Sequence, residues 1–99
     1  YISFAVGVEE SATSIYWAKR NAELNNLYNI EFISDKVENF LKVPHNYFNK
    51  LIVDPPRMGF HPNVLRYFSN LRNIDKIVFI SCNPSSYVRD ALILKKKGF

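Results

Sequence analysis

The sequence has few of the residues on which several classes of protein depend. One cysteine among 99 residues cannot form an internal disulfide, and alone it cannot supply a metal or iron–sulfur centre. A lone cysteine favours a reducing, cytoplasmic setting. The three glycines (Gly7, Gly59 and Gly98) lack the Gly-x-Gly-x-x-Gly spacing of a dinucleotide phosphate loop, which argues against a dehydrogenase.

Long apolar runs are also lacking. No apolar stretch approaches the roughly 20 residues that span a bilayer, and no basic-then-apolar signal opens the chain, so we expect no membrane partner. The histidines, His45 and His61, have no metal-ligand spacing, and we expect no metal. The whole sequence is 47% hydrophobic and 15% aromatic, which is enough for a globular core. Its net charge of +4 suits a polyanionic partner without requiring one.

Four apolar segments of β type alternate with helical patterns. The segments are residues 4–9, 30–34, 50–54 and 76–82, and the last two are nearly continuous in Leu, Ile, Val and Phe. Helices are predicted at 12–26, from Pro62 onward, and from Asn83-Pro84 to the lysines before Gly98. This alternation predicts an α/β fold with a parallel sheet.

The helices each have an apolar face that we expect to pack inward. These faces comprise Ile15, Ala18 and Ala22 in the first helix, Val64, Leu65, Phe68 and Leu71 in the second, and Val88, Ala91 and Leu92 in the last.

Chemically active side chains stand where the predicted strands end. These ends are Glu9, Ser34-Asp35, Asp54 and Cys82. Because ligands of parallel α/β sheets bind beyond the carboxyl ends of the strands, the sequence predicts a site at this edge.

Cys82 has two interpretations. A cysteine that ends an apolar strand is often a small buried hydrophobic residue. Alternatively, the thiol is a nucleophile, since Asn83 as cap and Pro84 place it at a helix N-terminus, which favours the reactive thiolate. The carboxylates at the other strand ends favour the nucleophile.

The carboxylates have alternatives too. Glu9 could cap the following helix, but an acidic residue at this place in nucleotide-binding α/β folds usually binds ribose hydroxyls, and we favour that role. In the stretch "DPPRMG", the two prolines form a rigid turn that can also fix the Asp54 carboxylate. Arg57 could meet a phosphate of a polyanionic partner or pair with an acidic neighbour. Arg89 is expected on a solvated face, or it could instead form a local ion pair with Asp90 that braces the last helix.

Three stretches, "VGVEESATSIYWAKRNAELNNLYNIEFIS", "LIVDPPRMG" and "ISCNPSSYVRD", occur in this order. Together they resemble the catalytic domain of the S-adenosylmethionine-dependent RNA 5-methyluridine (uracil-5-) methyltransferases. The resemblance implies that S-adenosyl-L-methionine is the cofactor and tRNA or rRNA the partner. It implies that Glu9 binds the ribose, Asp35 lies near the adenine, Asp54 lies beside the methionine moiety and the target base, and Cys82 is the nucleophile.

The same resemblance implies that residues 1–99 are a partial methyltransferase domain with an incomplete Rossmann-like fold. The first strand, its glycine-rich loop and the C-terminal part with the proton-abstracting glutamate are missing. Ser86 stands where the family usually has threonine. In the usual strand order the missing strand lies between residues 4–9 and 50–54. We therefore expect the chain alone to be unstable, rearranged or completed, for example by direct pairing of those two strands.

Two alternative functions remain open. The "DPP" stretch also suits an amino-methyltransferase acting on guanine or adenine, whose chemistry needs no thiol. The other alternative is a non-catalytic RNA-binding relic, which would bind by charge and ignore the cofactor.

Overall fold

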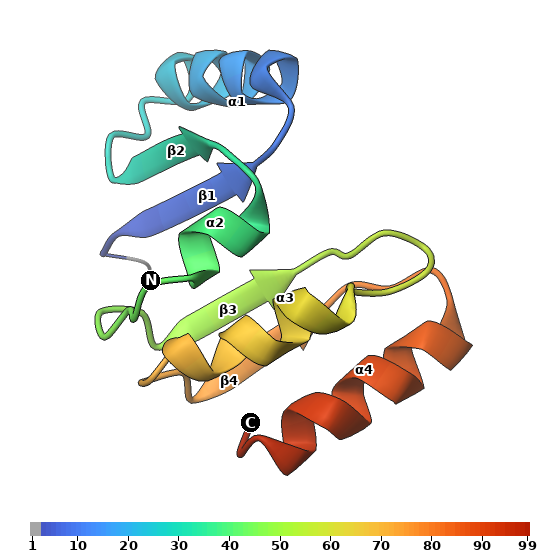
Figure 1. Ribbon diagram of the computed structural model, residues 1–99. Helices are drawn as coiled ribbons and strands as arrows, with labels where there is room; N and C mark the ends of the chain where they lie inside the picture. The colour runs from blue at the N-terminus through green and yellow to red at the C-terminus, as the bar shows by residue number, and fades with distance from the viewer. Residues whose placement is uncertain (1–2) are drawn as a thin grey trace. The chain divides into compact units, whose positions relative to one another are not determined.

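The structure is a computed structural model that describes residues 3–99, in which strands and helices alternate along the chain (Figure 1). In chain order the elements are β1 (Ala5–Glu9), α1 (Ala12–Leu24), β2 (Ile30–Ser34), α2 (Val37–Leu41), β3 (Lys50–Val53), α3 (Pro62–Tyr67), the 3-10 helix η1 (Phe68–Asn70), β4 (Lys76–Phe79) and α4 (Pro84–Lys96). The predicted alternation is confirmed, and only α2 was not foreseen. The chain divides into two compact units, residues 1–40 and 41–99.

Unit 1 is built on a parallel pair of strands. β1 pairs with β2 so that Ala5 lies opposite Ile30 and Glu9 opposite Ser34. Helix α1 contacts both strands and begins at a cap in which Ser11 Oγ accepts a hydrogen bond from Ser14 N at 3.2 Å. The predicted inner face of α1 is confirmed, since Ile15 and Ala22 are buried and Ala18 is half-buried.

Unit 2 contains the second parallel pair and most of the buried core. β3 pairs with β4 so that Lys50 lies opposite Lys76 and Val53 opposite Phe79. Its buried hydrophobic residues are Leu41, Val53, Val64, Leu65, Phe68, Leu71 and Leu94, and the predicted inner face of the helix that begins at Pro62 is thereby confirmed. Phe60 joins this core edge-on, with ring centroids 5.2 Å from Phe68 and 5.8 Å from Phe79.

The fourth strand is shorter than predicted. β4 ends at Phe79, although the next residue still pairs, since Ile80 N donates to Val53 O at 2.9 Å. Beyond Val53 the partner strand runs into Pro55 and Pro56, which lack backbone N–H groups and turn the chain. Residues 81 and 82 therefore have no neighbouring strand to pair with, and they form a loop.

Direct pairing of the first and third predicted strands, given above as one example of how the chain could be completed, is absent from the described chain. Among residues 3–99 the strands form two separate two-stranded sheets, β1 with β2 and β3 with β4. Within this range each strand is hydrogen-bonded along one edge only, to its neighbour along the chain. One edge of β1 and one edge of β3 carry no strand of the described chain.

The buried face of α4 differs from the predicted one. Val88 and Leu92 are 52% and 55% exposed, whereas Ser86, Asp90 and Leu94 are buried at an i, i+4, i+8 spacing. The helix is thus turned so that polar side chains face the protein. Apolar pattern alone could not show this, because the polar residues are buried only where they find hydrogen-bond partners.

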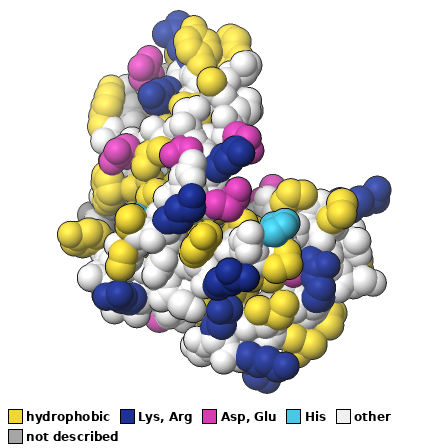
Figure 2. Space-filling view, in the orientation of Figure 1, with side chains coloured by type: hydrophobic (Ala, Val, Ile, Leu, Met, Phe, Trp, Pro, Cys, Tyr) yellow, Lys and Arg dark blue, Asp and Glu magenta, His cyan; other side chains and the backbone are white. Residues whose placement is uncertain are grey.

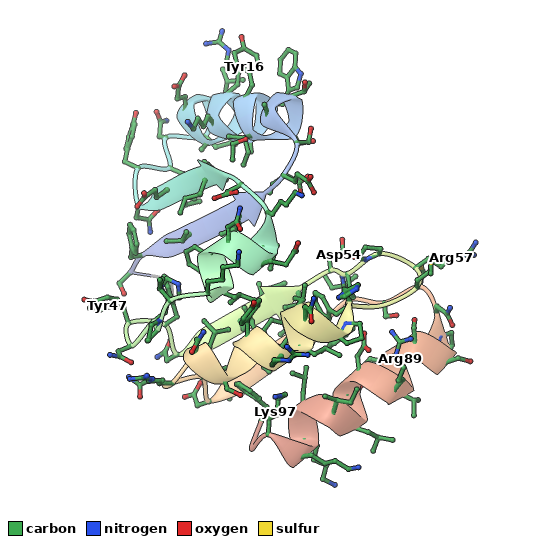
Figure 3. All side chains as sticks on the ribbon, viewed as in Figure 1. Tyr16, Tyr47, Asp54, Arg57, Arg89 and Lys97 are labelled. Carbon is green, nitrogen blue, oxygen red and sulfur yellow. The ribbon has the colours of Figure 1, made fainter. Side chains whose placement is uncertain are left out.

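We expect Phe68→Ala to lower the free energy of unfolding of unit 2 by about 3–5 kcal/mol, because it removes a buried ring and leaves a cavity. Tyr47→Ala should change it by less than about 0.5 kcal/mol, since Tyr47 is 91% exposed and projects into solvent (Figure 3). Urea titrations followed by far-ultraviolet circular dichroism compare the two variants. Equal losses in both would contradict a core centred on Phe68.

Candidate active site

Cys82 lies in the short loop that joins β4 to α4, and its side chain is exposed. The loop is shaped by Ser81, whose Oγ accepts from Asn83 N at 3.2 Å and donates to Asn83 O at 3.1 Å. Asn83 then caps α4, because its Oδ1 accepts from Ser85 N at 3.1 Å, and Pro84 is the first helical residue. The structure thus contradicts the alternative in which Cys82 is a buried residue ending a strand, and it presents the thiol beside a capped helix N-terminus.

Asp54 begins the loop that follows β3, and it too is exposed. Pro55 and Pro56 restrict the backbone directly after it, and Gly59 N donates to Pro56 O at 2.8 Å, which closes a turn. Arg57 projects outward from this loop (Figure 3). The rigid turn expected from the sequence is present.

Hydrogen bonds join the loop of Asp54 to the start of α4. Arg57 O accepts from Ser86 Oγ at 2.9 Å and from Asn83 Nδ2 at 3.2 Å. Ser86 keeps the hydroxyl of the threonine that the family resemblance leads one to expect. Through its bond to Arg57 O, this hydroxyl holds the loop against the start of α4. The structure therefore brings the segments of Asp54 and Cys82 together at one end of the β3–β4 sheet (Figure 1).

Glu9 and Asp35 meet in unit 1 at the carboxyl ends of β1 and β2, where Asp35 N donates to Glu9 O at 3.0 Å. One carboxylate oxygen of Glu9 accepts from Ser11 N at 3.1 Å, so part of the predicted capping alternative is present. The carboxylate remains exposed, and its second oxygen can still accept hydrogen bonds. Asp35 Oδ1 accepts from Lys36 N and Asn39 Nδ2 at 2.7 and 2.8 Å, which fixes its orientation at the start of α2.

The four predicted site residues are thus divided between the units. Glu9 and Asp35 belong to unit 1, and Asp54 and Cys82 belong to unit 2. The single edge predicted from the strand ends becomes two edges, one for each sheet. Within each unit the two residues lie on neighbouring strand ends, as the parallel pairing requires.

The sequence patterns gave Gly59 and Ser86 no hydrogen-bonding or packing role at this site, and they did not predict that Asp90 is buried. Asp90 is fully buried, and its Oδ1 accepts from Arg89 Nε at 3.0 Å, which confirms the local ion pair. The signal available in the sequence was the i, i+4 spacing of Ser86 and Asp90 on a helix that otherwise looks amphipathic.

The charges on the surface, the metal-binding side chains and the lengths of the helices each bear on one kind of partner: RNA, a metal ion or a membrane. Lys and Arg side chains are interspersed with hydrophobic ones on the face shown in Figure 2. Among residues 3–99, no group of three or more His, Cys, Asp and Glu side chains is placed to hold a metal ion. Across the same residues, none of the helices has both the length and the apolar character required to cross a bilayer.

Comparison with known proteins gives consistent matches. The sequence matches the family described as tRNA (Uracil-5-)-methyltransferase over residues 3–97. It is 36% identical over 94 residues to an uncharacterized RNA methyltransferase of Thermotoga maritima, and the match covers 95% of this chain and 21% of that protein. It is 39% identical over 103 residues to the 23S rRNA (uracil(1939)-C(5))-methyltransferase RlmD of Haemophilus influenzae, which covers 99% of this chain and 23% of that protein.

A solved structure is similar as well. The tRNA (uracil-54, C5)-methyltransferase of Pyrococcus abyssi, in complex with S-adenosyl-L-homocysteine, gives a TM-score of 0.76 at 32% identity and covers 91% of this chain and 22% of that one. The chain therefore spans about a fifth of the length of its relatives. Its strands and helices have the arrangement of an α/β methyltransferase fold. Within that class, the chain belongs to the tRNA (uracil-5-)-methyltransferase family.

We expect Asn83→Ala to lower the free energy of unfolding by about 1–2 kcal/mol, because the N-cap of α4 loses its acceptor. Asn83→Asp keeps that acceptor and adds a negative charge where the helix dipole favours one, which offsets the lost donor to Arg57 O. Its free energy of unfolding should stay within about 0.5 kcal/mol of the unsubstituted chain. Urea titration measures both, and an equal loss in the two variants would show that the cap is not the source.

Proposed function

We propose that the protein containing this chain transfers a methyl group from S-adenosylmethionine to carbon 5 of a uridine in tRNA or rRNA, with Cys82 as nucleophile. The observation that carries the proposal is the exposed thiol beside the capped start of α4, in a loop tied to the one that begins at Asp54. Membership of the uracil-5-methyltransferase family supports the same assignment.

The chemistry explains why a thiol is needed. Carbon 5 of uracil is a poor nucleophile on its own. When the Cys82 thiolate adds to carbon 6, the electrons of the 5,6 double bond move toward the carbon 4 carbonyl, and carbon 5 of the resulting enolate is electron-rich enough to take a methyl group. Removal of the proton from carbon 5 by a base then restores the double bond and expels the thiolate. One difficult step is thus divided into easier ones.

The side chains at the strand ends fit the cofactor by their chemistry. S-adenosylmethionine supplies, when bound, an electrophilic methyl group on a sulfonium. Glu9 is assigned to the paired ribose hydroxyls, because an exposed carboxylate with a spare oxygen is a suitable acceptor for them. Asp35, which is held in a fixed orientation, is assigned to the region of the adenine, and Asp54 to the methionine moiety.

The target uridine has to leave its base stack before a protein thiol can reach carbon 6. The exposure of Cys82 on a loop, rather than within a strand, allows an extruded base to approach it. Arg57, which projects outward from the neighbouring loop, is assigned to a phosphate of the RNA.

We expect the chain to bind S-adenosylmethionine in a calorimetric titration, and Asp54→Asn to weaken the affinity about tenfold or more through loss of a charged acceptor. Asp75→Asn is the matched control, because Asp75 is exposed directly before β4, at the opposite end of the strand from Cys82. It should bind like the unsubstituted chain. Equal weakening in both variants would contradict the assignment of Asp54.

In the whole protein with S-adenosylmethionine present, RNA that carries 5-fluorouridine at the target position should form a stable covalent complex. After methyl transfer, carbon 5 carries fluorine in place of the proton that the base would remove, so the thiolate is not expelled. Cys82→Ala should abolish the complex and lower methylation about a thousandfold or more. Gel mobility and mass spectrometry detect the adduct.

Two outcomes would favour the alternatives. Full methylation by Cys82→Ala would indicate an amino-methyltransferase of the "DPP" type. Salt-sensitive RNA binding with no affinity for the cofactor would indicate a non-catalytic relic.

A further inference from the structure

Side chains on one face of α4 hold the backbone of the loop formed by residues 57–60. Besides the bonds from Asn83 and Ser86 to Arg57 O, Arg89 Nη2 donates to Met58 O at 2.7 Å, and Phe60 N donates to Asp90 Oδ2 at 2.8 Å. We call this set of contacts the loop–helix clamp; its helix residues are Asn83, Ser86, Arg89 and Asp90.

Asp90 is the centre of the clamp. Its side chain is 0% exposed, and each carboxylate oxygen has one donor, Arg89 Nε for Oδ1 and Phe60 N for Oδ2. A buried carboxylate is costly unless it is paired and hydrogen-bonded. Asp90 therefore depends on the loop for half of its donors, and the loop depends on Asp90 for its position.

The ion pair of Arg89 and Asp90 does not serve to brace the helix. Adjacent residues on a helix point in different directions, so an i, i+1 pair does not tie one turn to the next. The Arg89 guanidinium instead connects Asp90 with Met58 O, which belongs to the loop. The pair is thus directed at the loop.

Gly59 allows the close approach that the clamp requires. Its φ is 84°, a conformation that L side chains rarely adopt. A Cβ at this position would lie 2.5 Å from Asp90 Oδ2 and would also collide with Arg89 Nη2. The absence of a side chain at residue 59 is what lets the loop backbone reach the buried carboxylate.

The clamp connects the two site segments over very short stretches of chain. Only Pro55 and Pro56 separate Asp54 from the clamped loop, and proline fixes the backbone angle φ. Cys82 is adjacent in sequence to Asn83, the first clamp residue on the helix side. Holding the loop against α4 therefore restricts the position of the Asp54 segment relative to the thiol.

We propose that Asp90 is a positioning residue that, together with Ser86 and Arg89, holds the 57–60 loop against α4 and thereby fixes Asp54 relative to Cys82. The roles of Asp54 and Cys82 rest on the proposed function, whereas the clamp itself is testable without RNA or cofactor. Asp90 does not touch the reacting atoms; it acts through the loop.

The single cysteine permits a direct test, because a nitroxide attached to Cys82 through a mixed disulfide reports local motion at that residue alone. In Asp90→Asn, the amide NH2 group replaces one carboxylate oxygen. It then faces either Arg89 Nε or Phe60 N, and because both are donors one hydrogen bond is lost. We expect the rotational correlation time of the nitroxide to shorten about twofold or more, because the loop is released while the helix persists. Far-ultraviolet circular dichroism verifies that helix content is unchanged.

Matched variants keep the test decisive if Asp90→Asn unfolds. Ser86→Ala removes the donor to Arg57 O and should also mobilise the nitroxide, whereas Ser86→Thr keeps the hydroxyl and should restore the unsubstituted spectrum. Ser85→Ala and Asp75→Asn, both at exposed positions, are the controls. Folded Asp90→Asn or Ser86→Ala with an unchanged spectrum would overturn the clamp.

A second readout separates positioning from stability. In the whole protein, Asp90→Asn should lower the saturating rate of adduct formation with 5-fluorouridine RNA about tenfold or more. The RNA concentration that gives half of that rate should stay within about twofold of the value for the unsubstituted protein. An unchanged saturating rate per folded molecule would overturn the positioning role. If the unsubstituted protein forms no adduct, the proposed function fails, while the nitroxide spectra still decide the clamp.

Discussion

A fully buried carboxylate needs hydrogen-bond donors, and the way Asp90 obtains them organises the site end of unit 2. One donor is the neighbouring Arg89, and the other is the backbone N–H of Phe60, thirty residues earlier in the chain. The charge would be costly in the interior without both partners. The position of the loop and the orientation of α4 therefore depend on each other. The helix can bury Ser86 and Asp90 only when the loop lies against it and supplies their hydrogen-bond partners. The position of Cys82, just before this helix, follows from the same contact.

The loop is also secured from its apolar side. While the backbone N–H of Phe60 bonds to Asp90, its ring packs against Phe68 and Phe79. The hydrophobic core and the polar clamp thus act on the same residue. This arrangement suits a reactive site, because a thiol and a carboxylate on short loops gain a defined geometry only when the loops are fixed to rigid elements. This region carries both the "DPPR" and the "SCNP" residues, on which the resemblance to the family partly rests.

The success of prediction differed between main chain and side chains. Strand and helix positions followed from apolar periodicity, and the residues at the strand ends were found because parallel strands bring their carboxyl ends to the same edge. The pattern failed where pairing partners decide the outcome: β4 stopped at Phe79 because its neighbour turns at Pro55, and β1 did not pair with β3. It failed again on α4, where Val88 and Leu92 were expected inside and Ser86 and Asp90 took that place.

The sequence by itself determined the α/β alternation, the helix boundaries marked by Pro84 and Gly98, and the family, because each depends on local pattern or on a motif. The chemical roles of the four residues at the strand ends are a prediction from the same motifs. The tertiary structure alone decided that Cys82 is exposed on a loop, that Glu9 and Asp35 lie in one unit with Asp54 and Cys82 in the other, and that Asp90 is buried. The physical reason is that burial of a polar group depends on donors from distant parts of the chain. A carboxylate on a helix stays solvated unless a donor from elsewhere in the chain meets it, and for Asp90 that donor is the backbone N–H of Phe60.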